Sequence, residues 1–256
     1  MSGPATTETS PANFTVTPRS GSTLLCDLLT DTGVAGQPNS FFRRESFVEW
    51  AQYFGINCSG WEQPHLFDAH YLSAVIRYGS NDTGVFGLRL MWESLDALSA
   101  RLGDLFPDTE SDCERLATAF STPRYLHLVR EDKVAQAISH LKAEALGLWH
   151  AHPDGSERER LSAEQPLRYN RTEISQMVAR HEADDASWGQ WFESQNINPM
   201  RITYESLAQN PVSVVADVLQ ALGAEPHYAI GLKPRTARLA DARSKRWYER
   251  FHSITK

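Results

Sequence analysis

The chain has 256 residues, of which 41% are hydrophobic and 22% are charged, so it can bury a sizeable core and wholesale disorder is excluded. Its formal net charge at pH 7 is −7, the wrong sign for a protein that coats nucleic acid or an anionic membrane. An anionic ligand must therefore meet a local basic site. We expect no nucleic-acid partner, and no integral membrane association because no run of about 18 apolar residues occurs.

The cysteines and the first residues of the chain indicate a compartment. Cys26, Cys58 and Cys113 are widely spaced and form no C-x-x-C pair, so they predict no zinc site. Free thiols are typical of a reducing environment. Residues 1–12 are rich in Thr, Ser and Pro and lack the basic start and apolar centre of a signal peptide. We therefore expect a cytoplasmic protein with a flexible N-terminal tail over residues 1–12.

Short runs of β-branched and aromatic residues alternate along the chain with longer stretches of helical periodicity. In chain order, these patterns predict a strand over Asn13–Thr17, helices over Thr23–Thr30 and Leu66–Tyr78, strands over Val85–Leu90 and Tyr125–Val129, helices over Asp132–Leu146 and Ile174–Phe192, and a strand over Arg201–Tyr204. Strands separated by helices form βαβ units. We therefore predict a three-layer α/β fold, in which helices cover both faces of a parallel sheet.

One stretch, Gly147–Arg171, lacks apolar periodicity and is rich in His, Pro, Glu and Arg. No linker divides the chain, so we expect a single domain over residues 13–256 with an excursion at about 147–171. Irregular stretches of this length are usually functional or mobile, and a lid and a subunit contact both remain open. Inside it, His150 and His152 form an H-x-H pair without the further ligands that a metal site needs.

The segment Thr17–Leu25 has the pattern of an anion-binding loop. A short strand runs into a turn at Gly21 and a Leu-rich helix begins at once, which points backbone N–H groups and the positive helix end at one spot. An ordinary helix N-cap is the alternative interpretation. Further donors for phosphate or sulfate oxygens are Arg19, Ser20, Ser22 and Thr23.

A nucleotide-binding P-loop of the form G-x-x-x-x-G-K-[ST] fits this segment poorly. It has one Gly and no Lys, and the strand Tyr125–Val129 is followed by Arg130 instead of a magnesium-binding carboxylate. A metal-dependent kinase or NTPase is therefore disfavoured.

The run R-S-G-S-T-L-L-C-D-L-L-x-x-T-G-V-A-G-x-P, from Arg19 to Pro38, resembles the bacterial trehalose 2-sulfotransferase family. The resemblance extends in order over roughly residues 13–250. It implies a P-loop NTPase-like sulfotransferase fold and transfer of a sulfuryl group from 3′-phosphoadenosine-5′-phosphosulfate (PAPS). It also implies that no metal is needed, that the acceptor is a hydroxyl of a small-molecule carbohydrate or a glycolipid, and that the protein is a homodimer.

Later segments extend the resemblance. Arg130, directly after a strand, and Ser139, nine residues on, are similar to the family's 3′-phosphate motif. They meet only if the helix folds back beside the strand end, as in a parallel α/β sheet. Tyr204 lies in a Y-E-x-L segment that the family places near the adenine, and Arg243 begins an R-S-x-x-W segment that implies a second cover over the donor. Without the resemblance, Arg130 reads as a surface ion pair, Tyr204 as a core aromatic and Arg243 as a solvated helix residue.

The chain departs from the family where the acceptor proton is removed. The family's base is a Glu before two aromatic residues, and Ser40 occupies that position, before Phe41. Ser cannot act as a general base at neutral pH. We expect Ser40, Phe41 and Trp92 to face the acceptor, although Trp92 also suits a core position.

Three explanations of this departure remain open. Glu45 is the nearest downstream carboxylate and our first candidate base, with Glu62, His65 and Glu93 as further options. A differently placed or anionic acceptor, bound by Arg43 and Arg44, is the second explanation. The third is a donor-nucleotide-binding protein with weak or no transferase activity.

Overall fold

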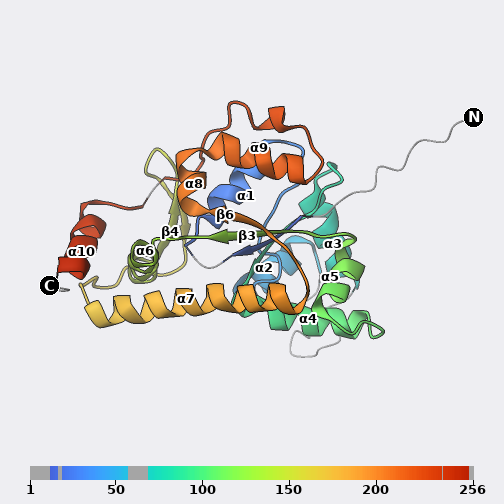
Figure 1. The fold of residues 1–256 in the computed structure, drawn as a ribbon, viewed down its shortest axis with the longest axis horizontal. Helices are drawn as coiled ribbons and strands as arrows, with labels where there is room; N and C mark the ends of the chain where they lie inside the picture. The colour runs from blue at the N-terminus through green and yellow to red at the C-terminus, as the bar shows by residue number, and fades with distance from the viewer. Residues whose placement is uncertain (1–11, 17–18, 57–68, 238, 254–256) are drawn as a thin grey trace, which may run out of the picture.

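The structure, a computed structural model, describes residues 12–16, 19–56, 69–237 and 239–253, with the side chains of 12–16 left aside. The predicted tail over residues 1–12 and the candidates Glu62 and His65 lie outside this description. In the described part, a parallel sheet of four strands forms the centre of the molecule (Figure 1). Its strands, in the spatial order β2-β1-β3-β6, are β1 (Ala12–Val16), β2 (Gly87–Met91), β3 (Arg124–Val129) and β6 (Met200–Thr203).

The register of the sheet aligns the carboxyl ends of its strands. Val16 of β1 is opposite Met91 of β2, and it is also opposite Leu128 of β3. Val129 of β3 is opposite Thr203 of β6. Because all four strands are parallel, the loops that follow them meet at one edge of the sheet. The predicted strands are therefore confirmed within a few residues at each end.

Helices cover both faces of the sheet, as the α/β prediction requires. Figure 1 shows α1, α8 and α9 on one side and α4 and α7 on the other. The helices with their bounds are α1 (Ser22–Asp31), α2 (Arg44–Tyr53), α3 (Ala69–Ser80), α4 (Trp92–Leu105), α5 (Asp112–Phe120), α6 (Lys133–Leu146), α7 (Arg171–Ser194), α8 (Tyr204–Gln209), α9 (Pro211–Ala221) and α10 (Ala242–Ser253), with the 3-10 turn η2 (Pro226–Ala229).

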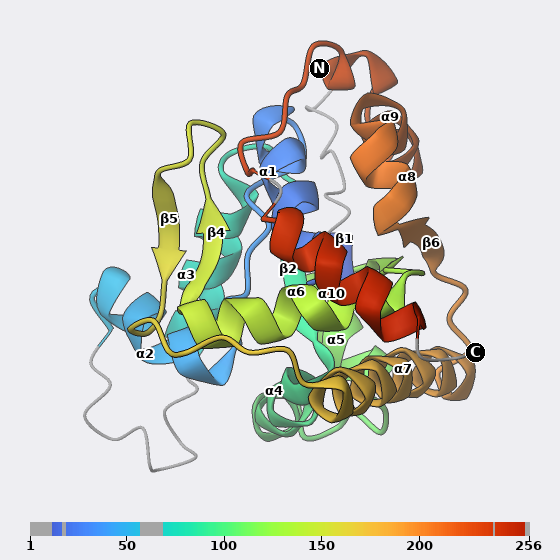
Figure 2. The same cartoon turned by 90° about the vertical axis from the view of Figure 1, so that its left-hand side faces the viewer.

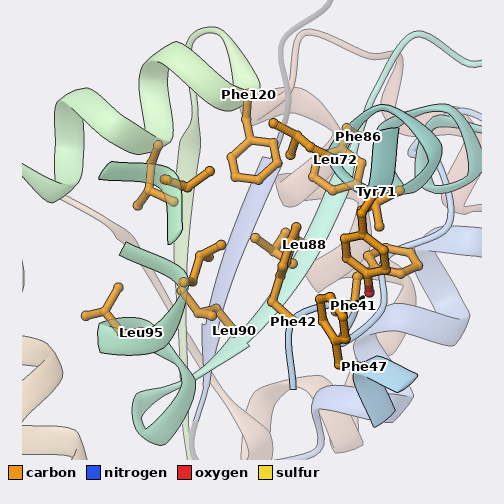
Figure 3. Packing of buried hydrophobic residues seen from close by; sticks show 14 of the residues in the cluster. Phe41, Phe42, Phe47, Tyr71, Leu72, Phe86, Leu88, Leu90, Leu95 and Phe120 are labelled. Carbon is orange, nitrogen blue, oxygen red and sulfur yellow. Dashed lines mark hydrogen bonds between the residues drawn. The ribbon is translucent and has the colours of Figure 1, made fainter. Parts of the chain in front are cut away.

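An aromatic core lies between the sheet and helices α2 to α5. Phe41 and Phe86 stack with ring centroids 6.0 Å apart, and Phe86 stacks in turn on Phe120 at 5.1 Å. Figure 3 shows these rings with the aliphatic side chains of β2 and α4. Trp188 of α7 is completely buried at the edge of this core, so the aromatic residues of that helix are packing residues.

A second, aliphatic core lies on the other face of the sheet. The predicted apolar stripe of α1 buries Leu25, Leu28 and Leu29 against Leu126 and Leu128 of β3. Helix α9 closes the same core from outside. This packing fixes the direction of α1, and hence the place of the loop that precedes it.

The predicted excursion is partly regular. It contains an antiparallel hairpin of β4 (Leu148–Ala151) and β5 (Glu157–Arg160), which the sequence pattern did not predict. Polar residues dominate β5, so periodicity gives no strand signal there. Beyond the hairpin, α7 runs under the sheet, and Figure 2 shows the C-terminal helix α10 beside α6, which it contacts.

Candidate functional site

A pocket of about 1110 Å³ opens at the carboxyl edge of the sheet. Its lining comes from segments far apart in sequence: the loop before α1, the turns after β3 and β6, helix α6, the hairpin and the C-terminal segment. In parallel α/β sheets this edge is where ligands bind. Of the predicted donor-binding residues, those that line the pocket are Arg19, Gly21, Ser22, Thr23, Arg130, Ser139 and Tyr204.

The loop before α1 has the backbone geometry of an anion site. Gly21 caps α1 in the left-handed region, with φ 89°, and no side chain caps the first turn of the helix. The first N–H groups of α1 therefore remain available to a ligand. A Cβ at Gly21 would lie 2.6 Å from Cδ2 of Tyr204, so this position requires glycine for space as well as conformation.

Ser20 differs from its neighbours in the loop. Its side chain is fully buried, it does not line the pocket, and its Oγ has no hydrogen-bond partner within the described residues. A buried hydroxyl without a partner costs about 1–3 kcal/mol. Because it is outside the lining, Ser20 is not placed to contact a ligand in the pocket, in contrast to its predicted role.

Two arginines meet beside this loop. Arg19 donates from Nε to Ser139 Oγ (3.1 Å) and from Nη1 to the carbonyl oxygen of Trp149 (2.6 Å). Arg130 lies over the ring of Tyr204 at 4.5 Å and donates to the carbonyl oxygen of Arg19 at 3.4 Å. Burial, and then the charge of Arg130, lower the pKa of Arg19 to about 10. Two cations held this close favour an anion between them.

The turn from β3 into α6 carries Arg130 and is held by a carboxylate that we did not single out from the sequence. Glu205 accepts hydrogen bonds from the backbone N–H groups of Glu131 (3.2 Å) and Asp132 (3.3 Å). Asp132 then caps α6 by accepting from the N–H of Ala135 (2.8 Å). Glu205 is the second residue of the Y-E-x-L segment, so the motif itself was the available signal.

Lys142, one turn beyond Ser139 on α6, is a second pocket residue that our sequence interpretation missed. Its buried ammonium donates to Asp241 Oδ1 (2.7 Å), Ser244 Oγ (2.8 Å) and the carbonyl oxygen of Leu239 (3.2 Å). These bonds fix the C-terminal segment as one wall of the pocket. Lysines are rarely buried, which makes this residue hard to predict. Its only signal in the sequence is the spacing of three residues from Ser139, which places both on one face of the helix.

At the start of α10, the pocket is covered by residues other than Arg243, which was predicted from the R-S-x-x-W segment. Arg243 is exposed and does not line the pocket, because it begins α10 on the face that points to solvent. Ser244 and Tyr248 of the same helix line it instead. Trp247 is buried against Tyr169, with ring centroids 5.8 Å apart.

The three residues expected to face the acceptor lie outside the pocket lining. Phe41 is completely buried in the aromatic core. Trp92 packs edge-on against Trp188, with ring centroids 5.1 Å apart. The chain segments that carry both residues run into the core. Ser40 is buried and accepts a hydrogen bond from Nε of Arg89 (2.7 Å). Arg89 thus joins the Ser40 position to the pocket.

The candidate bases are placed differently from one another. Glu45 lines the pocket, is exposed, and pairs with Nε of Arg43 at 3.0 Å. Glu93 also lines it and pairs with Arg180 at 3.5 Å. Arg44 is exposed and is absent from the lining.

The hairpin brings an imidazole to the anion loop. Nε2 of His150 lies 3.0 Å from Thr23 Oγ1 and 3.4 Å from Oε2 of Glu159, and Thr23 Oγ1 accepts from Nη1 of Arg89 at 2.8 Å. Burial, and then the charges of Arg19 and Arg89, lower the pKa of His150 to about 3. His150 is therefore neutral at pH 7.

Two features are absent from the part of the chain that the structure describes. No group of three or more His, Cys, Asp or Glu side chains gathers there as metal ligands would. None of the helices that the structure describes combines the length and apolarity of a membrane span.

Comparison with known proteins places the chain among sulfotransferases. Residues 14–253 match the family described as Stf0 sulphotransferase. A trehalose 2-sulfotransferase of Mycolicibacterium smegmatis is 33% identical over 258 residues, covering 91% of this chain and 91% of its own. One of Mycobacterium tuberculosis is 29% identical, covering 93% of this chain and 92% of its own.

Two solved structures resemble the chain at low identity. The sulfotransferase domain of the Synechococcus PCC 7002 olefin synthase has a TM-score of 0.42 and 14% identity, covering 99% of this chain and 91% of its own. A sulfotransferase of Alicyclobacillus acidocaldarius has a TM-score of 0.43 and 15% identity, covering 95% and 92%.

Proposed function

Because the chain belongs to the Stf0 sulphotransferase family, we propose that it transfers a sulfuryl group from PAPS to a hydroxyl of a carbohydrate or glycolipid. The observation that carries the donor is the meeting of Arg19, Arg130 and Ser139 in one pocket, beside a helix N-terminus that no side chain caps. PAPS has a phosphosulfate at the 5′ position of its ribose and a phosphate at the 3′ position. These residues offer hydrogen-bond donors for both groups.

In this proposal, two sets of residues bind the two anionic groups of the donor. The uncapped turn of α1, with Arg19, Ser22 and Thr23, binds the 5′-phosphosulfate. Arg130 and Ser139 bind the 3′-phosphate, which distinguishes this donor from ATP. The ring of Tyr204, already below the guanidinium of Arg130, forms a wall for the adenosine.

Sulfuryl transfer resembles phosphoryl transfer, in which most of the catalysis comes from positioning and charge stabilisation. The acceptor oxygen attacks sulfur in line with the bridging oxygen that leaves. Arg19 stabilises the charge that grows on the bridging oxygen and on the 5′-phosphate. The roles given to Arg19 and Arg130 need no metal ion.

The carbohydrate acceptor is proposed from two similar proteins. Both curated relatives bear the name trehalose 2-sulfotransferase and match over about nine-tenths of their length. Trehalose is therefore the first acceptor to test. Ser40 departs from the family in the acceptor-facing segment, so other sugars and glycolipids follow it in the panel.

A second candidate function is donor binding with weak or no transfer. It is favoured by one observation, since Ser40 stands where the family has its base and its hydroxyl is occupied by Arg89. The two candidates share the donor site and differ in turnover, so release of 3′-phosphoadenosine 5′-phosphate (PAP) from PAPS separates them.

The first experiment is calorimetric titration of the protein with PAP, ADP and ATP in the absence of metal. We expect PAP to bind in the micromolar range and at least tenfold more tightly than ADP. In Arg130→Ala, PAP affinity should fall by about tenfold or more, because a charged hydrogen-bond partner is worth about 1.5–3 kcal/mol.

Arg201→Ala is the matched control. Arg201 lies on the adjacent strand β6 and pairs with Glu131 at 3.4 Å on the surface, so its loss should leave PAP affinity unchanged. A preference for ATP with magnesium, or equal binding of PAP and ADP, would refute the donor assignment.

We include two further properties in the proposal, a homodimer and a cytoplasmic location. The free thiols of Cys26 and Cys113 support a reducing compartment. The dimer rests on the family resemblance alone, and its test is sedimentation of the purified protein over a range of concentrations.

A further inference from the structure

Ser40 offers no carboxylate, whereas the imidazole of His150 lines the pocket beside Thr23 of the anion loop. From this geometry we infer that His150 is the general base that removes the proton of the acceptor hydroxyl, and that Glu159 stabilises the imidazolium that forms. The inference rests on the proposed sulfuryl transfer and names a catalytic residue for it.

The other candidate bases in the pocket already have partners. Glu45 forms an ion pair with Arg43 at 3.0 Å, and Glu93 forms one with Arg180 at 3.5 Å. His150 also lines the pocket, and its imidazole lies between the anion loop and the hairpin.

The hydrogen bonds around Thr23 allow the tautomer of His150 that a base requires. Thr23 Oγ1 accepts from Nη1 of Arg89 at 2.8 Å, and its own hydrogen can be donated to Nε2 of His150, 3.0 Å away. In the inferred mechanism Nε2 is the unprotonated nitrogen, with its lone pair directed at the anion loop.

Donor binding makes this lone pair available. In the proposed site Thr23 donates its hydroxyl hydrogen to the 5′-phosphosulfate, and His150 then loses its partner beside the sulfuryl group. An acceptor hydroxyl that enters there replaces Thr23 as the donor to Nε2. The base is thus exposed only when the donor is bound.

The charges that face His150 explain how its strength is adjusted. Burial, and then the charges of Arg19 from the loop, Arg89 from β2 and Arg158 from β5, lower its pKa to about 3, and the carboxylate of Glu159 lies 3.4 Å from its Nε2. A bound phosphosulfate neutralises part of the arginine charge. It therefore raises the pKa of His150 toward its ordinary value, where a general base is most effective at neutral pH.

The chemical step balances with these groups. The acceptor oxygen forms a bond to sulfur while the bond between sulfur and the bridging oxygen breaks, and the electron pair of that bond stays on the leaving 5′-phosphate. The acceptor proton moves to Nε2 of His150. Glu159, 3.4 Å from the same nitrogen, stabilises the resulting positive charge until the proton passes to water.

The test compares His150→Gln and His150→Ala with the wild type. The readouts are the rate of PAP release from PAPS, with trehalose and with water as acceptor, and the affinity for PAP. General-base catalysis contributes about 10²–10⁴-fold, so we expect kcat to fall by at least about 100-fold in both variants. PAP affinity should stay within about threefold, because the bonds of the donor site remain.

Chemical rescue separates a base from a structural residue. Free imidazole should restore part of the activity of His150→Ala and should not affect the wild type. The control is His152→Gln, an exposed histidine two residues along the same hairpin that does not line the pocket, and it should behave as the wild type.

The outcomes separate this inference from the proposed function. If the wild type does not bind PAP, the proposed function fails with the inference. If PAP binds but the wild type releases none from PAPS, or if His150→Gln retains kcat within about threefold, the donor site stands and the base assignment is wrong. A parallel loss of PAP affinity without imidazole rescue would also overturn it, as a structural role.

Discussion

His140 of α6 and His181 of α7 meet inside the protein as a pair of uncharged rings. Nδ1 of His140 lies 3.2 Å from Nε2 of His181, and the rings stack with centroids 5.1 Å apart. Burial, and then Arg180, lower the pKa of His140 to about 4, while burial and then His140 lower that of His181 to about 3. This pair joins α6 to the long helix α7, and the contact depends on both rings being uncharged.

The pair predicts an acid-sensitive fold. Below about pH 6.5 the unfolded chain binds a proton at each histidine, whereas the folded protein binds them only as the pH approaches 4. The unfolded state then holds more protons, so the free energy of unfolding falls as the pH falls. Each histidine should contribute up to about 1.4 kcal/mol per pH unit between pH 6.5 and 5.

Denaturant titrations of His181→Gln at several pH values check this prediction. Glutamine keeps a hydrogen-bonding group toward His140 and removes one titrating site. The slope of the free energy of unfolding against pH should therefore decrease by the equivalent of about one proton. His152→Gln, on the exposed hairpin, should keep the slope of the wild type. Equal slopes for His181→Gln and the wild type would contradict the assignment.

At the scale of elements, the β4–β5 hairpin is attached to α1 by an ion pair. Arg158 of β5 binds both carboxylate oxygens of Asp27, and the Asp27 side chain is only 10% exposed. The hairpin also carries His150 and the carbonyl group of Trp149 that Arg19 contacts. The ion pair therefore holds one wall of the pocket against the anion loop.

Arg158→Ala should loosen this wall. It leaves the buried carboxylate of Asp27 without its partner, which costs about 3 kcal/mol of stability. Amide hydrogen exchange in β4 and β5 should become faster, and kcat should fall while His150 remains present. Arg160→Ala is the control, because Arg160 of the same strand is exposed and pairs with Glu157 inside the hairpin. Similar effects of the two variants would show that the bond to α1 does not matter.

At the scale of the molecule, the chain closes on itself at the pocket. The C-terminal segment crosses back over the start of the fold, where Arg235 pairs with Asp31 of α1 and the N–H of Ala237 donates to the carbonyl oxygen of Ala151. Lys142 adds bonds from α6 to the residues that begin α10. The last part of the chain therefore completes a site that the first part begins.

Lys142→Met tests this closure. The apolar stem is kept and the exposed Asp241 can hydrate, so the loss of global stability should be only about 1 kcal/mol. Hydrogen exchange in α10 should nevertheless become at least about tenfold faster, and PAP affinity should decrease. Arg246→Met, which removes an exposed cation of α10 that does not line the pocket, should change neither. Unchanged exchange in α10 of Lys142→Met would show that other contacts hold the segment.

Several parts of the fold and site could be predicted from local sequence because local chemistry decides them. The alternation of apolar runs and helical periods predicts the strands, and the Leu stripe of α1 predicts the face that is buried. Glycine at a left-handed helix start and the hydroxyls around it indicate an anion loop. Arg130 after a strand and Ser139 in the next helix line one pocket, because parallel strands end at one edge of the sheet.

The other features of the fold and site depend on which residues face one another in the folded protein. The spacing of residues along the sequence does not contain that information. Phe41 and Trp92 are aromatic residues in a motif, yet the core of α2 to α5 takes both. His150 is 127 residues from Thr23, and the two meet because Asp27 holds the hairpin against α1. The residue pattern alone was enough for the α/β class and the family, and for the hypothesis of an anion-binding loop before α1. Only the tertiary structure decided which wall faces that loop, because burial and charge pairing act between segments that are distant in the chain.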